Sequence, residues 1–386
     1  MRLRTLRATG WRNLEPLRLD FDAEVRLHVL HGDNGQGKTN VLEAVYYLAA
    51  FRSFRTSHTA DLLRRGSTQA DIGVEVATAE LVRSVEVGLV LAGESEASKV
   101  TRTVKLDGKG VRRVAAAFGI ASVVLFVPED LLLVRAAPAA RRRFVDLAIS
   151  GVEPAYFGEA AAFQRILRSR NALLRANRTN VSPVLLDTYD EQLASAGARL
   201  VARRRAIVAA LGPRVAEIFR SLHGDLPVTL TYDSDPAVAA AGGEGEVAEV
   251  LRAGLAHRRR VDGLRGHTTY GPQTDDLGIR LGERPAREHA SQGQLRSLVL
   301  ALKLAELGNV EASRGESPVL LLDDVPSELD PTRRRYLFET LAGLSCQTVV
   351  SVADPEVVPP LPGRADFRVV AGRLSPVQVF PLQRSP

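Results

Sequence analysis

The segment 32–39, GDNGQGKT, constrains this chain most, because it matches the phosphate-loop pattern G-x-x-x-x-G-K-[ST]. Residues 25–30 before it alternate and are rich in β-forming side chains, which predicts a strand. Residues 40–48 after it carry apolar side chains at helical spacing, which predicts an amphipathic helix. A strand, a glycine loop and a helix in this order favour phosphate binding over a chance glycine-rich turn.

The residue types of this loop suit a polyphosphate. Glycines let bare backbone N–H groups approach the anion at a helix N-terminus, where unpaired donors and the helix dipole both attract it. Lys38 would reach the β- and γ-phosphates, and the Thr39 hydroxyl would ligate Mg²⁺. The predicted nucleotide-binding residues of this segment are Gly32, Asn34, Gly35, Gly37, Lys38, Thr39 and Asn40.

A second candidate half-site lies far downstream, where the apolar run 318–322 ends in Asp323 and Asp324. A buried strand would hold Asp323 at the sheet edge beside the phosphate loop, as a ligand of Mg²⁺. Asp324 would orient or deprotonate the attacking water. Many strands end in an acidic turn, so this pattern alone is a weak signal. Together with a phosphate loop it indicates a nucleotide site. The predicted catalytic residues are therefore Asp323 and Asp324, and the metal ligands are Thr39 and Asp323.

Between these half-sites, the tetrapeptide 291–294, SQGQ, precedes a helical run at 295–304. Alone it indicates an ordinary helix cap. The order of phosphate loop, S-x-G-Q, Asp-Asp strand and the segment 327–330, SELD, resembles the ATP-binding cassette class of ATPases. That resemblance implies ATP as the nucleotide, an ATP-dependent homodimer, and contacts from Ser291 and Gly293 of one copy to the ATP of the other. About 250 residues separate Gly37 from Ser291, a layout similar to the SMC-like branch.

Composition bounds the remaining possibilities. A hydrophobic fraction of 45% and a charged fraction of 25% in 386 residues indicate an ordinary globular chain with a second, smaller domain. No apolar stretch of about 18 residues and no signal-peptide core occur, so we expect a cytoplasmic protein without a membrane partner. The single cysteine, Cys346, excludes an internal disulfide and is expected to be a buried packing residue.

The net charge of +6 and the repeated arginine pairs and triplets suit a nucleic-acid backbone. Compositional bias with arginines on solvated helix faces explains them equally well. Charge alone therefore leaves both interpretations open.

The predicted fold is α/β: a P-loop ATP-binding cassette-type head with an antiparallel β layer, plus a helical, coiled-coil-like second domain. We expect the N-terminal part of the head at 1–145, the helical arm at 146–255 and the C-terminal part of the head at 256–386. Asp107-Gly108 predicts a hairpin turn. The strand 123–127 stands where cassette ATPases carry their glutamine loop, and the absent glutamine leaves Glu129 as its replacement.

The chain as a whole resembles the RecF family of bacterial DNA repair proteins. The segments that carry the resemblance are 11–13, 35–44, 51–55, 127–131, 141–146, 271–277, 291–294 and 321–324. The family implies an ATPase that dimerises on ATP, binds double-stranded DNA at gaps or junctions with single strands, and works with RecO and RecR to load RecA. It also implies that Arg12 and Asn13 support the nucleotide. For the DNA groove we expect contributions from Arg52, Arg55, Arg141 and Arg142.

This sequence departs from the RecF pattern at one place and from the pattern of cassette ATPases, including transporter cassettes, at two. Gln273 and Thr274 replace a histidine and an arginine, residues 349–354 offer no switch histidine, and Asp324 replaces a longer glutamate. The shorter base predicts slow ATP hydrolysis, and the resemblance to a DNA repair family implies that DNA stimulates it. Two alternatives stay open: a structural SMC-like DNA clamp without a loading role, and the ATPase subunit of a transporter, against which the long insertion and the missing histidine argue.

Overall fold

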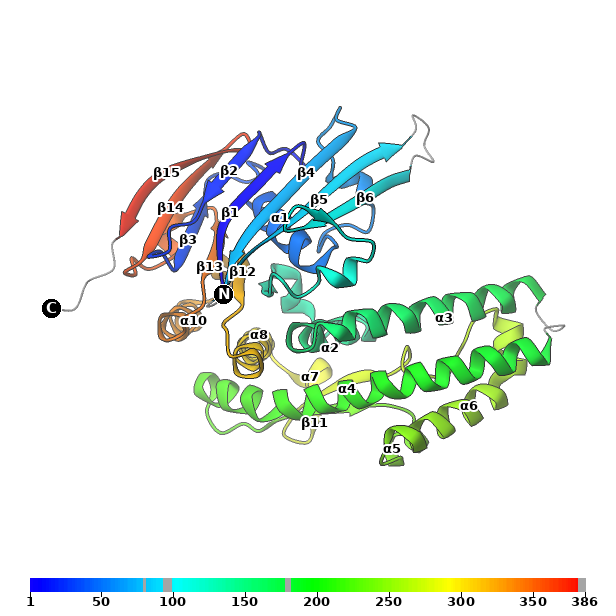
Figure 1. Ribbon diagram of the computed structural model, residues 1–386. Coiled ribbons are helices and arrows are strands. Elements are labelled where there is room, and N and C mark those ends of the chain that lie inside the picture. The colour runs from blue at the N-terminus through cyan, green and yellow to red at the C-terminus, as the bar shows by residue number, and fades with distance from the viewer. Residues whose placement is uncertain (79–80, 93–98, 178–181, 381–386) are drawn as a thin grey trace. The chain divides into compact units, whose positions relative to one another are not determined.

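The computed structural model describes residues 1–78, 81–92, 99–177 and 182–380 in two compact units (Figure 1). The first unit comprises Met1–Leu131 and Glu306–Pro386, and the second comprises Leu132–Ala305. The sequence predicts these boundaries at 145 and 255 instead. Residues 132–145 and 256–305 group with the helical arm because helix α2 (Pro138–Val152) and strand β10 (Asp276–Leu281) pack on elements of that unit.

A six-stranded sheet in the order β15-β14-β3-β13-β12-β8 forms the centre of the first unit. Five of its strands run parallel, and only the edge strand β15 is antiparallel. Every residue of β12 and β13 is buried, as expected for a parallel sheet covered on both faces. The carboxyl ends of β3 and β12 therefore lie at one edge of the sheet. The strands are β3 (Leu27–His31), β8 (Val123–Phe126), β12 (Val319–Asp323), β13 (Thr348–Val352), β14 (Arg364–Val370) and β15 (Arg373–Phe380).

The second sheet of this unit is the expected antiparallel layer, with the order β2-β1-β4-β5-β6-β7. Asp107 and Gly108 both have positive φ between β6 and β7, which confirms the predicted hairpin turn. The strands are β1 (Arg2–Thr9), β2 (Leu17–Asp20), β4 (Gln69–Ala77), β5 (Val82–Ala92), β6 (Lys99–Leu106) and β7 (Lys109–Gly110).

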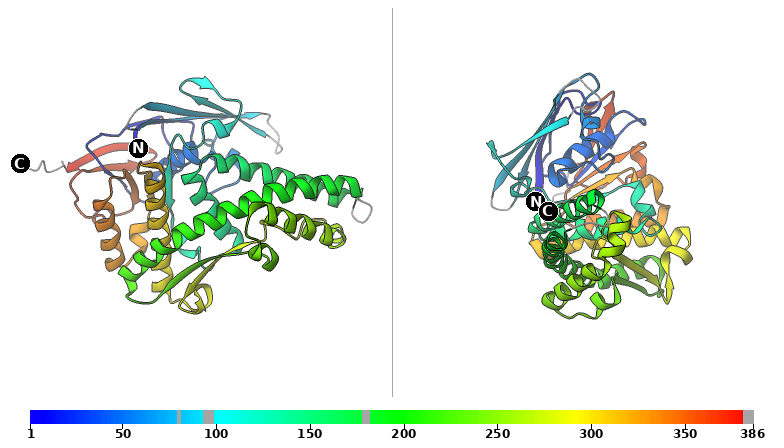
Figure 2. Two further views of the ribbon diagram at one scale, coloured as in Figure 1. Left: turned by 60° about the horizontal axis from the view of Figure 1, so that its bottom comes forward. Right: turned by 90° about the vertical axis from the view of Figure 1, so that its right-hand side faces the viewer.

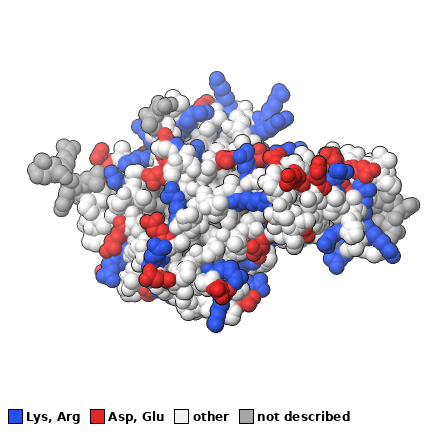
Figure 3. Space-filling model, turned by 90° about the horizontal axis from the view of Figure 1, so that it is seen from below, with Lys and Arg blue, Asp and Glu red and all other residues white. Residues whose placement is uncertain are grey.

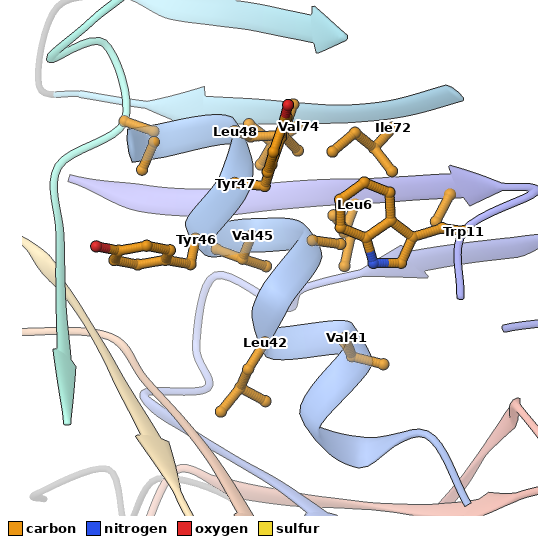
Figure 4. Close-up of a cluster of buried hydrophobic side chains, with 14 of the residues drawn as sticks. Leu6, Trp11, Val41, Leu42, Val45, Tyr46, Tyr47, Leu48, Ile72 and Val74 are labelled. Carbon is orange, nitrogen blue, oxygen red and sulfur yellow. The ribbon is translucent and has the colours of Figure 1, made fainter. Parts of the chain in front are cut away.

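Helix α1 (Lys38–Ala50) is buried on nearly every side because it packs against both sheets. Leu6, Ile72 and Val74 approach it from the antiparallel sheet, and the ring of Trp11 packs edge to face on Tyr47 (Figure 4). The sequence predicted an amphipathic helix. A helix covered all round instead belongs to the core, and that core holds the helix following the phosphate loop rigidly.

Shorter elements complete the first unit. Helices α9 (Val325–Glu328) and α10 (Pro331–Gly343) follow β12, and Asp330 caps α10 by accepting from the backbone N–H groups of Thr332 and Arg333. Four 3₁₀ helices occur in the described residues of this unit or at its boundary: η1 (Thr59–Leu62), η2 (Val114–Ala116), η3 (Pro128–Leu132) and η4 (Pro355–Val357). Cys346 is buried, as expected of a packing residue, and burial raises the pKa of its thiol to about 11.

The second unit is mainly helical, and its long helices α3 and α4 run side by side (Figures 1 and 2). The apolar stripe that includes Leu193, Leu200 and Ile207 lies on α4, a single helix of 41 residues, and is buried within the chain. No helix among the described residues has the length and apolar character to cross a membrane. The elements are α2, α3 (Ala155–Asn177), α4 (Pro183–His223), β9 (Val228–Asp233), α5 (Pro236–Ala240), α6 (Glu244–Arg265), β10, β11 (Arg284–Pro285), α7 (Ala286–His289) and most of α8 (Gln292–Arg314).

Candidate nucleotide-binding site

The phosphate loop has the backbone that its sequence requires. It leaves strand β3 at Gly32 and enters α1 at Lys38, and Gly32, Gly35 and Gly37 all have positive φ. A Cβ atom at Gly37 would stand 2.9 Å from Oδ1 of Asn13. A side chain at Gly37 is therefore disfavoured both by the left-handed backbone and by a lack of space.

Lys38 is held over its own loop. Its Nζ donates to the carbonyl oxygens of Gly32 at 2.5 Å and Asp33 at 2.9 Å, and the side chain is largely buried. Burial lowers the pKa of Lys38, while the negative charges of Asp324, Asp323 and Asp33 oppose this shift. Phosphate oxygens are stronger acceptors than neutral carbonyls, so an anion in the loop can displace these two bonds.

The two half-sites predicted from the sequence meet in the structure. The Thr39 hydroxyl donates to Oδ1 of Asp323 at 2.8 Å, and the Ser351 hydroxyl donates to the same oxygen at 2.6 Å. Burial raises the pKa of Asp323, and the two hydroxyl bonds counteract that rise. A hydroxyl and a carboxylate in contact are hard oxygen donors of the kind that Mg²⁺ uses together with substrate phosphates. Thr39 and Asp323 therefore fit the metal that the sequence predicted.

Asp324 follows with a left-handed backbone, φ 54°, at the start of α9. Its backbone N–H donates to the carbonyl of Ser351 at 2.9 Å, and its carboxylate accepts from the Ser327 hydroxyl at 2.7 Å. The side chain is thus held within its own turn, one residue from Asp323. Its role as the hydrolytic base stays a prediction.

Asn13 and Asn40 brace the phosphate loop from the outside. Nδ2 of Asn13 donates to the carbonyl of Gly35 at 3.0 Å, and Oδ1 of Asn13 accepts from Nδ2 of Asn40 at 2.7 Å. The Arg55 guanidinium donates to Oδ1 of Asn40 at 2.7 Å. This chain of bonds connects an exposed arginine with the loop backbone.

Arg12 uses its guanidinium within the protein. Nε and Nη2 donate to the two carboxylate oxygens of Glu43, each at 2.8 Å, and Nη1 donates to the carbonyl of Asp61 at 2.8 Å. Arg12 also has a positive φ of 49°. These contacts give Arg12 a positioning role next to Asn13, and direct contact with a nucleotide stays a prediction.

The signature tetrapeptide lies in the second unit and forms a reciprocal helix cap. The Ser291 hydroxyl accepts from the backbone N–H of Gln294 at 3.2 Å, and Oε1 of Gln294 accepts from the backbone N–H of Ser291 at 2.8 Å. Ser291 is exposed at the start of α8. The cap and the exposed position are compatible with the predicted contact to a second copy, which stays a prediction for Ser291 and Gly293.

Comparison with known proteins gives a consistent result. The family described as RecF/RecN/SMC N terminal domain matches residues 2–360. The DNA replication and repair protein RecF of Anaeromyxobacter sp. (strain Fw109-5) is 42% identical over 381 residues, which cover 98% of this chain and all of that protein. RecF of Myxococcus xanthus (strain DK1622) is 42% identical over 93% of this chain and 92% of its own length. The chain belongs to the RecF family.

Solved structures agree with this assignment. A structure of the recombination mediator protein RecF with ATPrS superimposes with a TM-score of 0.87 at 28% identity, covering 98% of each chain. An Smc head bound to the C-winged helix domain of ScpA gives a TM-score of 0.54 at 15% identity and is similar in fold alone. The predicted fold class, a cassette-type α/β head with an antiparallel layer and a helical domain, is confirmed.

The structure corrects one part of the predicted DNA surface. Arg141 is buried, donates to both oxygens of Asp276 and also bonds the carbonyls of Val134 and Ala136. The prediction of a DNA contact is wrong for Arg141, because its guanidinium is buried and bonded to protein oxygens and so cannot reach a phosphate backbone. Local sequence does not distinguish an arginine paired inside the unit from one in solvent.

The other residues of this surface lie differently. Arg142 is half-buried and donates to the carbonyl of Asp275 at 2.6 Å, whereas Arg52 and Arg55 are exposed. Basic and acidic side chains are interspersed on the face shown in Figure 3. Arg52 and Arg55 are exposed, and their contact with DNA stays a prediction.

Two family departures also have a local structural account. Gln273 donates to the carbonyl of Tyr270 at 2.9 Å, and Thr274 donates to that of Gly271 at 2.7 Å, so both close a turn within the second unit.

Glu129 is exposed, whereas its neighbour Asp130 accepts from the backbone N–H of Val127 at 3.0 Å. The proposed replacement of the missing glutamine by Glu129 stays a prediction.

Sequence reasoning missed Glu43, Ser351 and Gln36. Glu43 is fully buried and accepts from Arg12 and from the Ser53 hydroxyl at 2.5 Å. One signal was available for Glu43: a carboxylate inside an otherwise apolar helix needs a buried cationic partner. Ser351 and Gln36 carry no such signal, since each acts through a contact with a distant segment.

Proposed function

We propose that this chain is an ATP-dependent DNA-binding protein of recombinational repair. It binds ATP with Mg²⁺, dimerises on ATP, binds duplex DNA at single-strand gaps or junctions, and with RecO and RecR promotes the loading of RecA. The observation that carries the proposal is the bond between Thr39 and Asp323, which joins a complete phosphate loop to a carboxylate 284 positions away.

The contacts of Lys38, Thr39 and Asp323 support the following chemistry at this site. Lys38 exchanges its loop carbonyls for phosphate oxygens, and the glycine-rich backbone donates its N–H groups to the anion. Mg²⁺, held by Thr39 and Asp323, supplies neutralisation of phosphate charge when bound. Asp324 orients the attacking water, and its short side chain makes hydrolysis slow, so that ATP serves mainly as a switch.

Dimerisation couples to ATP through differential affinity. Ser291 and Gly293 of one protomer contact the γ-phosphate held by the other, and these contacts exist only in the dimer. The exposed cap at the start of α8 supports this, because a helix N-terminus attracts anions. Further support comes from relatives that are named DNA replication and repair proteins, and from solved RecF structures with ATP and ATPrS in the RecFOR pathway.

Light scattering of the protein with and without ATP tests the proposal. Lys38→Met removes the phosphate-binding cation and should abolish ATP-dependent dimerisation. Asp324→Asn keeps the site but removes the base, so it should dimerise on ATP and fail to turn it over. A Lys38→Met protein that still dimerises with ATP refutes the scheme.

DNA substrates separate this proposal from a structural SMC-like clamp or a transporter subunit. A repair protein that acts at gaps should show ATP hydrolysis stimulated by DNA and a preference for gapped over blunt duplex. A transporter subunit should show neither. Equal affinity for gapped and blunt duplex would contradict the assignment to gaps and junctions.

A further inference from the structure

The turn between β14 and β15 touches the phosphate loop, although 335 positions separate the two segments. Its two central residues, Ala371 and Gly372, have φ of 47° and 78°. The backbone N–H of Ala371 donates to Oε1 of Gln36 at 2.6 Å, and that of Gly372 donates to the carbonyl of Gln36 at 2.8 Å. Gln36 is thus held by both its side chain and its backbone.

The same turn also packs on the segment that braces the loop from the other side. The carbonyl of Gly372 accepts from the backbone N–H of Glu15 at 3.1 Å. A Cβ atom at Gly372 would collide with the carbonyl oxygen of Asn13 and stand 3.0 Å from Cα of Leu14. Asn13 in turn bonds Gly35 of the loop, so the turn contacts the loop directly at Gln36 and indirectly through Asn13.

These contacts restrain a loop whose glycines have little conformational preference of their own. Gly35 and Gly37 have left-handed backbones, and nothing lies within 4 Å of a Cβ at Gly35. Glycines lose the most conformational freedom when they are ordered. A loop that must present several N–H groups to one anion gains affinity when neighbouring segments hold that conformation in advance.

We propose that the β14–β15 turn is a latch that positions the phosphate loop for nucleotide, with Gln36 and Gly372 as its positioning residues. This inference rests on the proposed binding of ATP. The latch sets nucleotide affinity without touching the nucleotide, because it decides how often the loop adopts its anion-binding conformation before ATP arrives.

A matched pair of glycine substitutions tests the latch. Gly372→Ala introduces the collision with Asn13 at a left-handed position. Gly108→Ala places an alanine at nearly the same φ, 74°, in the similar turn of the β6–β7 hairpin, where no atom lies within 4 Å of the new Cβ. Both variants place an alanine at nearly the same left-handed backbone, so the difference between them reports the contact of the turn with Asn13 and Leu14, the segment that braces the loop.

Titration of each variant with a fluorescent ATP analogue gives the first measurement. We expect Gly372→Ala to raise the Kd by about tenfold and Gly108→Ala to leave it within about twofold. Hydrogen exchange of the amides at 35–38 without nucleotide should accelerate in Gly372→Ala and not in Gly108→Ala. Equal affinities and equal exchange in the two variants would overturn the latch.

Gln36→Met keeps the test decisive if Gly372→Ala does not fold. Methionine preserves the length of the side chain but removes the acceptor for Ala371, while the bond from Gly372 to the backbone carbonyl remains. We expect a Kd increase of about fivefold with the thermal stability of the free protein little changed. If the unaltered protein fails to bind ATP, the proposed function fails. If it binds ATP and Gln36→Met binds equally well, only the latch fails.

Discussion

Removal of the Arg12 guanidinium should destabilise the first unit substantially, because it leaves a buried carboxylate without its main partner. Glu43 is fully buried, and 17% of the Arg12 side chain is exposed. Two charge-assisted bonds of 2.8 Å join them, and Arg55 lies 3.8 Å from Glu43 as a weaker substitute. Breaking a buried ion pair from one side costs about 3–5 kcal/mol. The partial exposure of Arg12 and the nearby Arg55 place Arg12→Ala at the lower end, about 3 kcal/mol.

Trp11 offers an assay specific to this region. It is the single tryptophan of the chain, it is fully buried beside Arg12, and its indole N–H donates to the carbonyl of Asn40 at 3.1 Å. Urea unfolding followed by Trp11 fluorescence therefore reports the first unit without a signal from the second. The substitutions to measure are Arg12→Ala, Glu43→Gln and the double variant.

The double-mutant cycle decides whether the ion pair is responsible. Glu43→Gln removes the charge that Arg12 compensates, so the double variant should be more stable than the sum of the single losses predicts, by about 2 kcal/mol. If the two losses add to within about 0.5 kcal/mol, the pair is not coupled and the reasoning from burial is refuted.

Two further predictions concern pH and salt. Burial against Phe21 lowers the pKa of His28 from 6.5 to about 4, because a buried ring disfavours the charged form. The contribution of neutral His28 to the free energy of unfolding is therefore complete above pH 6.5. It is lost as the pH falls towards 4, and this loss is at most about 3 kcal/mol. Urea unfolding at pH 7.5 and 5 should show a smaller pH dependence for His28→Phe than for the unaltered protein, and identical dependence would contradict the role of His28. Duplex binding should weaken steeply between low and moderate salt, and Arg52→Ala should reduce the slope of log Kd against log salt by about 1 in a fluorescence anisotropy titration. The control Arg203→Ala, whose exposed guanidinium pairs with Glu153 at 3.1 Å, should leave the slope unchanged, and salt-independent binding would exclude the electrostatic mechanism.

Much of the head was predictable because its signals are local. The strand, glycine loop and helix at 27–50 follow from β-forming side chains, positive-φ glycines and helical spacing, and the structure forms these elements as β3, the loop and α1. The Asp107-Gly108 hairpin follows from turn chemistry. The strand before Asp323 follows from a short apolar run that begins after Pro318 and ends at two aspartates, because a run of this length with such flanking residues favours a buried strand.

The sequence predicts the domain boundaries and the partners of charged residues less well. The segment 256–305 contains a phosphate-site motif and was assigned to the head, yet β10 pairs with β9 and joins the second unit. The pairing of β9 with β10, which are more than forty residues apart, depends on how the chain between them folds. No local sequence pattern specifies such a pairing. Arg141 illustrates the same limit, because an arginine triplet has the same sequence whether its first member pairs with Asp276 or faces solvent.

By itself, the sequence determined that this chain contains a phosphate loop, a second carboxylate half-site and a cassette-type order of motifs, because each is written in consecutive residues. Only the tertiary structure decided that Thr39 meets Asp323, that Glu43 is held by Arg12, and that the turn at Ala371 touches Gln36. Each of these contacts joins segments brought together by sheet order and helix burial, and their energies depend on distances and exposure that exist only after folding.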